Sequence, residues 1–409
     1  MQIKPILSAL RRHKAGTFLI AMQIALTLAI VCNALFIIQQ RLAHLSEPSG
    51  VDERNIFIIQ NEWVGPSSTE QSDAKMREDL AVLRGLAGVQ DVTPSNSYPL
   101  RGGGWDDGVK LKPDQLQDSS GATIYFGDDR FVDALGLNLI AGRNFRPEEI
   151  TRMDMRDRLA PPVVMVTKAL ADKLFPAGDA VGKTIYLIGG PATVVGVIDL
   201  LQAQSVDRWA SAFAYRSVIV PRRLAVSLGG FYLVRAKPGQ LDAVMRAAPK
   251  ALFEHNPRRV INDEDGVLSF DQVRSRAYER DRGMAILMGV ICVVLLAITA
   301  AGIVGLTSFW VGQRRKQIGV RRALGATRQD ILRYFMAENL LISCGGVVVG
   351  ALLAVAINLW LVTRFEMHRL SLVYLLMGVV ILLLLGQGAV LAPAMRASRV
   401  PPVEATRSV

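Results

Sequence analysis

The chain has 409 residues, of which 51% are hydrophobic, and a formal net charge of +11. Its length could hold two or three soluble domains, but the hydrophobic share and the positive mean hydropathy are typical of a membrane protein. A nucleic-acid-binding protein is excluded, because residues 41–282 hold 31 Lys and Arg against 32 Asp and Glu and the basic excess lies beside apolar stretches instead.

Four stretches without Asp, Glu, Lys or Arg are each longer than the roughly 20 residues that a helix needs to cross a bilayer. They cover residues 15–40, 283–313, 339–363 and 370–395. The sequence therefore predicts four transmembrane helices. The first stretch follows a basic start, as in a signal peptide, but it is too long for a signal core, so we expect an uncleaved anchor.

Basic residues flank these helices on one side of the membrane. They are Lys4, Arg11, Arg12 and Lys14 before the first helix, Arg314, Arg315, Lys316, Arg321, Arg322, Arg328 and Arg333 between the second and third, and Arg396, Arg399 and Arg407 after the fourth. Because cytoplasmic loops carry the excess of Lys and Arg, segments 1–14, 314–338 and 396–409 are predicted inside. Segments 41–282 and 364–369 are then outside, and both termini are cytoplasmic.

The segment 41–282 alternates β-rich runs with helix-like runs, which predicts a mixed α/β domain of two subdomains. Strands are predicted at 55–60, 123–127, 162–167, 184–189, 192–198 and 231–236, and helices at 72–86, 129–135, 168–175 and 240–255. The expected fold is a four-helix membrane bundle with this large extracytoplasmic domain between its first two helices.

Three segments of this domain have an ambiguous pattern. The glycine-rich stretch 99–108 and the stretch 200–217 read either as mobile contact loops or as ordinary surface loops with a half-packed Trp105 or Trp209. The charged run 271–282 contains no Gly or Pro and turns apolar, so a stiff stalk helix is expected to continue from the domain into the second membrane helix.

The segment 314–338 reads as helix, break and helix. Gly325 stands where a helix ends with a left-handed residue, and Thr327 with Asp330 forms a capping-box-like start of the next helix. Its apolar face is made of Ile331, Leu332, Phe335 and Met336. The basic residues could simply meet anionic lipid headgroups. Alternatively, Ile318, Val320 and Leu324 form an apolar knob with a basic rim that docks another protein.

Other sequence features argue against catalysis. Residues 177–184 (AGDAVGKT) resemble a phosphate-binding loop, but Ala177 stands where that motif needs glycine and a strand follows, so Gly182 is read as a turn residue. His13, His44, His255 and His368 are scattered, and Cys32, Cys292 and Cys344 all lie in apolar stretches. We therefore expect no catalytic, cofactor-binding or metal site and no disulfide, and His255 is expected at the end of a surface helix.

The run IGVRRALGAT (318–327), followed by a helix with Glu338, resembles the signature of the MacB and FtsX type of ABC permeases. Residues 392–407 are similar to the C-terminus of that family, and residues 131–145 and 175–200 are similar to its external domain. Gln317 departs from the pattern, since many members have an acidic residue there, so a charge contact to the ATPase is absent or replaced.

The resemblance implies a non-catalytic permease subunit that docks an ABC ATPase, which binds the ATP and Mg²⁺. The docking residues carried over are Gln317, Ile318, Gly319, Val320, Arg321, Arg322, Ala323, Leu324, Gly325, Ala326, Thr327 and Glu338. Family members act as dimers, here either a homodimer or a heterodimer, and some work with a membrane-fusion adaptor and an outer-membrane channel. The expected function is export of peptides, antimicrobials or lipid-linked substrates. The alternative is an FtsX-like transducer that regulates a cell-wall hydrolase without transport.

Overall fold

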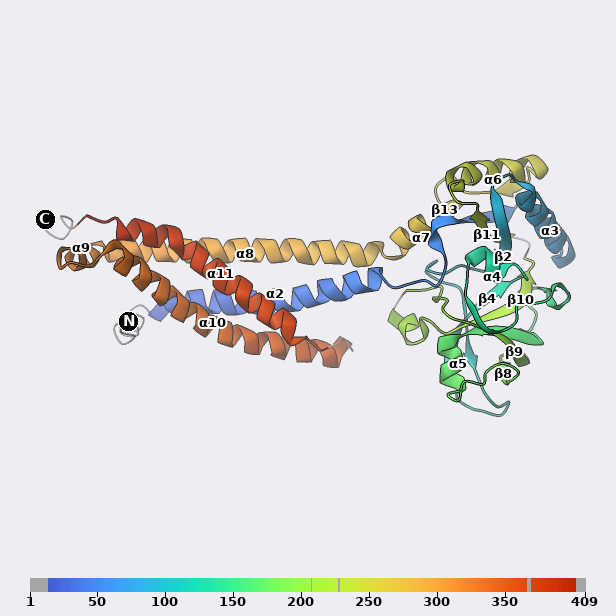
Figure 1. Cartoon of the computed structure of the whole chain (residues 1–409), viewed down its shortest axis with the longest axis horizontal. Coiled ribbons are helices and arrows are strands. Elements are labelled where there is room, and N and C mark those ends of the chain that lie inside the picture. The colour runs from blue at the N-terminus through green and yellow to red at the C-terminus, as the bar shows by residue number, and fades with distance from the viewer. Residues whose placement is uncertain (1–13, 207, 227–228, 366–368, 402–409) are drawn as a thin grey trace. The chain divides into compact units, whose positions relative to one another are not determined.

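The computed structural model describes residues 14–206, 208–226, 229–365 and 369–401 and divides the chain into two compact units (Figure 1). We call residues 1–46 with 280–409 the helical unit and residues 47–279 the sheet domain. Parts of the predicted segments 1–14, 364–369 and 396–409 fall outside the described residues. With them fall Lys4, Arg11, Arg12, His13, His368 and Arg407.

The helical unit contains four long helices, each long and apolar enough to cross a membrane. They are α2 (Lys14–Leu45), α8 (Glu279–Gln313), α10 (Arg328–Phe365) and α11 (Leu372–Ser398), and the short α9 (Arg315–Ala323) lies between α8 and α10. The prediction of four membrane helices with a large domain between the first two is therefore confirmed. Each helix overlaps one predicted apolar stretch, and α10 begins 11 residues before its stretch.

Helices α2 and α10 pack closely through small residues. Gly346 and Gly350 are separated by three residues on α10, and a Cβ atom at either position would lie within 2.8 Å of a backbone oxygen of α2. Helices in lipid associate by this kind of close contact, because water cannot drive apolar surfaces together there. The shared core of the unit also includes side chains from α8 and α11, such as Ile303 and Leu382.

Polar side chains link α2 to α8. Thr27 and Thr299 share a buried hydrogen bond of 2.8 Å, and Gln23 Nε2 donates to the Ile298 carbonyl oxygen at 3.1 Å. Near the C-terminal end of α2, Arg41 and His44 both contact the carboxylate of Asp281, which is buried near the start of α8. These contacts fix the register of the two helices. Helix α8 otherwise exposes much apolar surface, as lipid-facing helices do.

The sheet domain contains two sheets. The first has the order β12-β1-β11-β2, β13 also pairs with β1, and all its pairs are antiparallel. Its strands are β1 (Ile56–Trp63), β2 (Val89–Ser95), β11 (Gly229–Ala236), β12 (Arg259–Val260) and β13 (Val267–Ser269). Helices α3 (Thr69–Gly85) and α6 (Leu241–His255) cover one face of it with Met76, Leu80, Val244 and Leu252. The shorter helices near this sheet are α4 (Phe131–Leu135) and α7 (Phe270–Ala277).

The second sheet is mixed, with the order β3-β4-β10-β7-β9-β5, β6 on β10 and β8 on β9. Its strands are β3 (Trp105–Val109), β4 (Ser120–Gly127), β5 (Leu139–Gly142), β6 (Thr151–Met153), β7 (Val163–Thr167), β8 (Thr184–Leu187), β9 (Gly190–Ile198) and β10 (Ser217–Leu224). Helix α5 (Lys168–Leu174) packs on it, and three short 3₁₀ helices are η1 (Glu53–Asn55), η2 (Pro147–Glu149) and η3 (Arg208–Phe213).

The predicted strands and helices of this domain are all present, with small shifts at their ends. Seven strands were not predicted: β2, β3, β5, β6, β10, β12 and β13. Of these, β10 pairs with β4, β6 and β7. Pro221 in its middle weakens the strand pattern, because proline lacks the N–H that a sheet ladder uses. His255 is the last residue of α6, and Gly182 adopts a turn with φ +83° before β8, as expected.

The two ambiguous loops hold each other in place. Gln204 is buried, its Oε1 accepts a hydrogen bond from the Trp105 backbone at 2.8 Å and its Nε2 donates to the Ile124 carbonyl oxygen at 2.9 Å. The mobile interpretation is therefore wrong for residues 201–205, which are buried. Trp105 is half-packed on Phe126, whereas Trp209 is 56% exposed.

The expected continuous stalk helix over residues 271–282 is wrong at one residue. Helix α7 ends at Ala277, Tyr278 has φ −104° and ψ 11°, and α8 begins at Glu279. Tyr278 leaves the helical conformation because its ring is buried in the sheet domain, where its hydroxyl accepts a hydrogen bond from Gln202. A charged run without Gly or Pro could not reveal this tertiary constraint.

Candidate functional site

The turn between α8 and α10 ends α9 with a left-handed glycine. Gly325 has φ +97°, its N–H donates to the Arg322 carbonyl oxygen at 3.2 Å, and the Ala326 N–H donates to the Arg321 carbonyl oxygen at 3.0 Å. These two bonds form the Schellman arrangement that closes a helix. The role predicted for Gly325 is confirmed.

Helix α10 begins with the predicted capping box. The Thr327 hydroxyl accepts a hydrogen bond from the Asp330 backbone N–H at 3.2 Å, and Asp330 Oδ2 accepts from the Thr327 N–H at 3.0 Å. Asp330 also places a negative charge in the first turn, where the helix dipole favours it. Together with Gly325, this cap fixes the direction in which the chain leaves α9.

A buried ion pair holds the base of the turn. Arg314 Nη1 lies 3.0 Å from both carboxylate oxygens of Glu338, and both side chains are almost fully buried. The pair joins the residue after α8 to the first turns of α10. Glu338, predicted as an ATPase contact, therefore faces the bundle and braces the turn instead of lining its surface.

Two more basic residues attach α9 to its surroundings. Arg322 Nη1 donates to the carbonyl oxygens of Ser398 and Val400 at 2.9 and 3.1 Å, at the C-terminal end of α11 where the helix dipole is negative. The guanidinium of Arg321 lies 4.9 Å from the centre of the Tyr334 ring, a cation–π contact. Helix α9 is thus fastened to both α10 and α11.

The outer face of α9 carries the exposed apolar residues. Leu324 is 83% exposed and Val320 is 44% exposed, whereas Ile318 is 4% exposed and belongs to the core of the helical unit. The predicted knob of three residues is therefore wrong for Ile318, which lies on the same face of α9 as Arg322, four residues later, and so turns toward the bundle.

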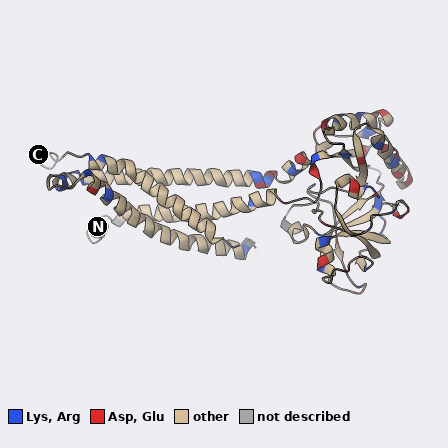
Figure 2. Ribbon diagram, viewed as in Figure 1, with Lys and Arg blue, Asp and Glu red and all other residues tan. Residues whose placement is uncertain are grey.

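The other predicted docking residues divide between the two faces. Exposed are Gln317, Arg321, Ala323, Gly325 and Thr327; Arg322 and Ala326 are half-buried, and Gly319 is buried. Figure 2 shows Lys and Arg around α9 and the neighbouring helix ends, and also at the far ends of the long helices. The exposed basic residues around the turn lie on α9 and in the first turns of α10. They are Arg315, Lys316, Arg321, Arg328 and Arg333. We call Val320, Leu324 and these five residues the α9 face.

The α9 face suits a protein partner that offers an apolar pocket with acidic residues around it. Among the residues that the structure describes, no group of three or more His, Cys, Asp or Glu could hold a metal ion.

The sequence could suggest the exposed face and the two caps, which depend on neighbours three or four residues apart. The Arg314–Glu338 and Arg322 contacts span 24 and about 76 residues and carry no local signal.

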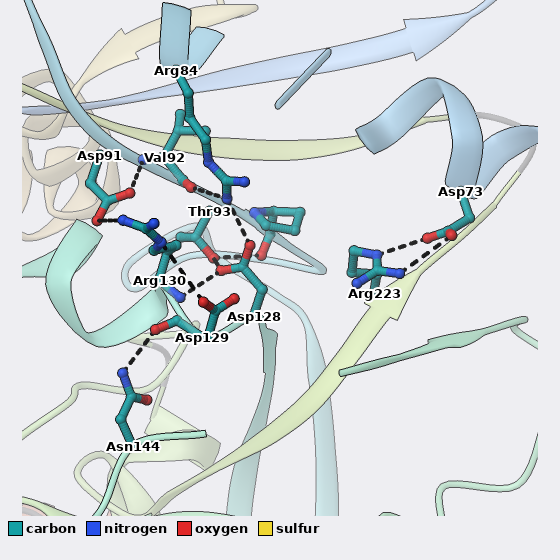
Figure 3. Close-up of polar contacts among 11 residues, drawn as sticks. Asp73, Arg84, Asp91, Val92, Thr93, Asp128, Asp129, Arg130, Asn144 and Arg223 are labelled. Carbon is teal, nitrogen blue, oxygen red and sulfur yellow. Dashed lines mark hydrogen bonds and ion pairs between the residues drawn. The ribbon is translucent and has the colours of Figure 1, made fainter. Parts of the chain in front are cut away.

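A second polar cluster joins the two sheets of the sheet domain (Figure 3). Asp128, at the end of β4, accepts hydrogen bonds from Arg84 Nη2 at 3.0 Å and from the Thr93 hydroxyl at 2.7 Å. Burial raises the pKa of Asp128, and the hydrogen bond from Thr93 and the nearby Arg84 oppose that rise. Arg130 lies 3.6 Å from Asp91 in the same cluster.

The other end of α3 is tied to the second sheet as well. Arg223 of β10 forms two hydrogen bonds with the carboxylate of Asp73, at 2.8 and 3.3 Å (Figure 3), and the Thr69 hydroxyl donates to Asp154 at 2.6 Å. Helix α3 belongs to the first sheet but is anchored to the second at both ends. The sheets are therefore held in one fixed arrangement by polar contacts.

Two family models match the chain. The model described as the MacB-like periplasmic core domain matches residues 17–251, and the model described as the FtsX-like permease C-terminal matches residues 289–402. The first covers more than half of the chain and includes α2 and most of the sheet domain. The second covers most of α8, the turn, and α10 and α11.

Three relatives show how far the similarity extends. The chain is 26% identical over 292 residues to the uncharacterized ABC transporter permease YvrN of Bacillus subtilis, which is 69% of each chain. It is 22% identical to the uncharacterized ABC transporter permease YknZ of the same organism, over 99% of this chain and 98% of YknZ. It is 25% identical to the macrolide export ATP-binding/permease protein MacB of Chromobacterium violaceum, over 78% of this chain. The match spans 49% of that MacB, about half its length.

Proposed function

Because this chain belongs to the MacB/FtsX-type family of ABC transporter permeases, we propose that it couples ATP hydrolysis by a separate ATPase chain to movement of its sheet domain. The sheet domain is the periplasmic domain of a multi-pass membrane protein. The movement drives export of peptides, antimicrobials or lipid-linked substrates. The single observation that carries the proposal is the exposed α9 face on a rigidly braced turn.

The bracing of α9 makes it suitable for transmitting force. Arg314–Glu338 holds its beginning, Arg322 holds it to the end of α11, and the Gly325 and Thr327 caps hold its end. A partner that displaces α9 therefore displaces α8, α10 and α11 with it. A mobile loop would absorb the same displacement.

The relatives support a separate ATPase. YknZ, which is named a permease, is matched over 98% of its length, whereas the protein named ATP-binding/permease is matched over 49%. The loop at residues 177–184 lacks the glycine and the following helix of a nucleotide-binding loop. We propose that ATP and Mg²⁺ bind to the partner chain.

The orientation follows from charge. Exposed Arg and Lys gather around α9, and cytoplasmic segments carry the excess of basic residues. We therefore propose that α9 and both termini lie in the cytoplasm and that the protein lies in the bacterial inner membrane. A reporter fused at Gly108, in the sheet domain, should then report a periplasmic location, and a cytoplasmic signal would contradict the orientation.

Regulation of a cell-wall hydrolase, as by an FtsX-like transducer, is the second candidate. It is favoured by the FtsX-like match over residues 289–402, but that match covers only the last three long helices and the turn. The sheet domain falls under the MacB-like match, so we prefer export.

Replacing Leu324 with Asp tests the docking face. The change buries a charge in the proposed contact, so the variant should lose its co-purifying ATPase while still accumulating in the membrane. Leu116→Asp is the matched control, because Leu116 is 99% exposed in the sheet domain and lies in a loop far along the chain from α9. Normal recovery of an ATPase with Leu324→Asp would overturn the docking assignment.

The proteins that co-purify with the tagged wild-type chain separate the two functions. An ATPase with a membrane-fusion adaptor, and an outer-membrane channel, supports export. An ATPase with a peptidoglycan hydrolase supports the transducer, and no ATPase contradicts both. Co-purification of two differently tagged copies tests for a homodimer, and a related permease in the eluate indicates a heterodimer.

A further inference from the structure

Two segments of the sheet domain connect it to the membrane helices. The incoming segment, residues 47–55, follows α2, and the outgoing segment, residues 270–278, precedes α8. Arg274 ties them together, because its Nη1 donates to the Glu47 carbonyl oxygen at 3.0 Å and its Nε donates to Glu53 Oε2 at 3.0 Å. Any displacement of one segment therefore reaches the other.

Gln202 contacts both segments and the second sheet. Its backbone N–H donates to the Ser49 carbonyl oxygen at 2.9 Å, in the incoming segment, and its Nε2 donates to the Tyr278 hydroxyl at 3.1 Å, in the outgoing segment. Its carbonyl oxygen accepts a hydrogen bond from the Tyr125 hydroxyl at 2.7 Å. Tyr125 belongs to β4, so one residue joins three parts of the domain.

All three side chains are buried. Gln202 is 1% exposed, and both tyrosines are among the largest fully buried or nearly buried side chains of the domain. Burial raises the pKa of Tyr125 well above its usual value, so its hydroxyl stays protonated and continues to donate. Buried hydrogen bonds are protected from competing water, which makes these contacts stiff.

The backbone of the incoming segment also lies close to the backbone of Leu200, two residues before Gln202. Gly50 has φ +85°, and a Cβ atom there would lie 2.1 Å from the Leu200 carbonyl oxygen. Only glycine allows both this conformation and this approach. Next to Gln202, the Leu201 carbonyl oxygen accepts a hydrogen bond at 3.0 Å from the hydroxyl of Ser217, the first residue of β10.

We propose that Gln202 is the positioning residue through which displacement of the outgoing segment reaches the second sheet. This inference rests on the proposed function, since it names the path by which movement of α8 becomes movement of the domain. The Tyr278 break interrupts the helix, so α7 and α8 do not form one rigid rod into the domain. The Tyr278 hydroxyl, Gln202 and the Tyr125 hydroxyl form a continuous hydrogen-bonded path to β4 instead.

Gln202 carries a buried side-chain amide that packing alone does not require. Its Oε1 has no hydrogen-bond partner among the described residues, so the buried amide is only half satisfied. A methionine of similar length would fill the same space without that cost. Gln202→Met is therefore expected to fold and to remove the contact with Tyr278 alone.

The experiment is hydrogen–deuterium exchange on the full chain in lipid nanodiscs, with its co-purified ATPase, with and without a non-hydrolysable ATP analogue. The variants are Gln202→Met, Tyr278→Phe and the double variant. Gln115→Met is the matched control, because Gln115 makes hydrogen bonds only within its own loop, to Leu111 and Ser119. Thermal unfolding of each variant checks that the fold is retained.

Without nucleotide, each single variant should speed exchange in residues 270–278 roughly fivefold, the effect of losing one buried hydrogen bond. The double variant should be no faster than Tyr278→Phe, because that variant has already lost the contact with Gln202. Gln115→Met should leave these residues unchanged. Additive effects of the two substitutions would overturn the direct contact.

With nucleotide, the wild type should change its exchange in residues 270–278 and in β4. In Gln202→Met the response at 270–278 should persist and the response in β4 should be smaller than in the wild type, because the Ser49 contact with the Gln202 backbone remains. If β4 still responds in Gln202→Met as in the wild type, Gln202 is an ordinary structural residue and the inference fails while the proposed function stands. If the wild-type sheet domain shows no response at all, the proposed function fails and the inference fails with it.

Discussion

The sheet domain and the helical unit bury polar groups in opposite ways. In the sheet domain the guanidinium of Arg259 and the carboxylate of Asp79 are almost completely buried and paired at 2.8 Å, with the Tyr232 hydroxyl also bonded to Asp79. In the middle of the membrane helices the buried polar contacts are uncharged, as between Thr27 and Thr299. Charged pairs such as Arg314–Glu338 lie near helix ends.

The difference follows from the solvent of each unit. Water drives apolar surfaces together in the sheet domain, and this gain can offset the desolvation of a well-bonded ion pair. Lipid is as apolar as the helices, so the helical unit relies on close contact at glycines and on a few hydrogen bonds. The consequence is that the largest single-residue effects should come from charges in one unit and from added volume in the other.

The largest effect is expected for Asp79→Ala. The substitution leaves Arg259 buried without its charge partner, which typically costs about 3–5 kcal/mol. Asp172→Ala is the control, because the Lys168–Asp172 pair is exposed and should contribute little to stability. Thermal unfolding of the full chain in detergent measures both, and equal effects would break the contrast between buried and surface pairs.

In the helical unit, Gly350→Leu should be the most damaging of the changes considered. Even a Cβ atom would lie 2.8 Å from the Ala25 carbonyl oxygen, so α2 and α10 must separate, at a cost of about 1–3 kcal/mol. Gly345→Leu is the matched control on the same helix, because a Cβ atom there meets nothing within 4 Å. A loss of thermal stability in both variants would mean that the close α2–α10 contact is not the cause.

A smaller, pH-dependent effect on stability is expected at Asp128, in the polar cluster that joins the two sheets. Burial raises the pKa of Asp128, so the folded state binds this proton more tightly than the unfolded state does. Its contribution to stability is complete below about pH 4, the usual carboxyl range, and is lost as pH rises through the raised value. In Asp128→Asn the melting temperature should therefore fall less as the pH rises from acid to neutral. A melting temperature that depends on pH as in the wild type would contradict this assignment.

The smallest effect is expected for Thr27→Val, which removes one hydrogen bond between α2 and α8. Such bonds in membranes contribute about 0.6 kcal/mol on average, because the separated helices find other partners. Thr363→Val serves as the control, since that hydroxyl bonds only within its own helix, to Trp360. A loss as large as that of Asp79→Ala would show that polar contacts dominate the membrane unit as well.

Sequence reasoning was most successful where the physics is local. Four apolar stretches predicted four helices, and Gly325 and the Thr327–Asp330 cap were predicted from spacings of three or four residues. Six strands and four helices of the sheet domain were predicted from β-rich and helix-like runs, and seven further strands were not. These signals depend only on neighbours along the chain.

It failed where distant segments decide the outcome. Ile318 and Glu338 were assigned to a docking surface, but the bundle turns the first inward and Arg314 draws the second into an ion pair. Residues 201–205 lack periodicity, yet they are buried because Gln202 and Gln204 satisfy backbone groups of other segments. No pattern within the loop itself records those partners.

The distribution of cysteines affects how the protein is made. All three lie in the membrane helices, and the 233-residue sheet domain contains none. Its folding after translocation therefore needs no thiol oxidase or disulfide isomerase, and reducing agents should leave its yield unchanged. A cysteine engineered into this domain would be the protein's one thiol outside the membrane helices. It could then be labelled selectively in intact cells.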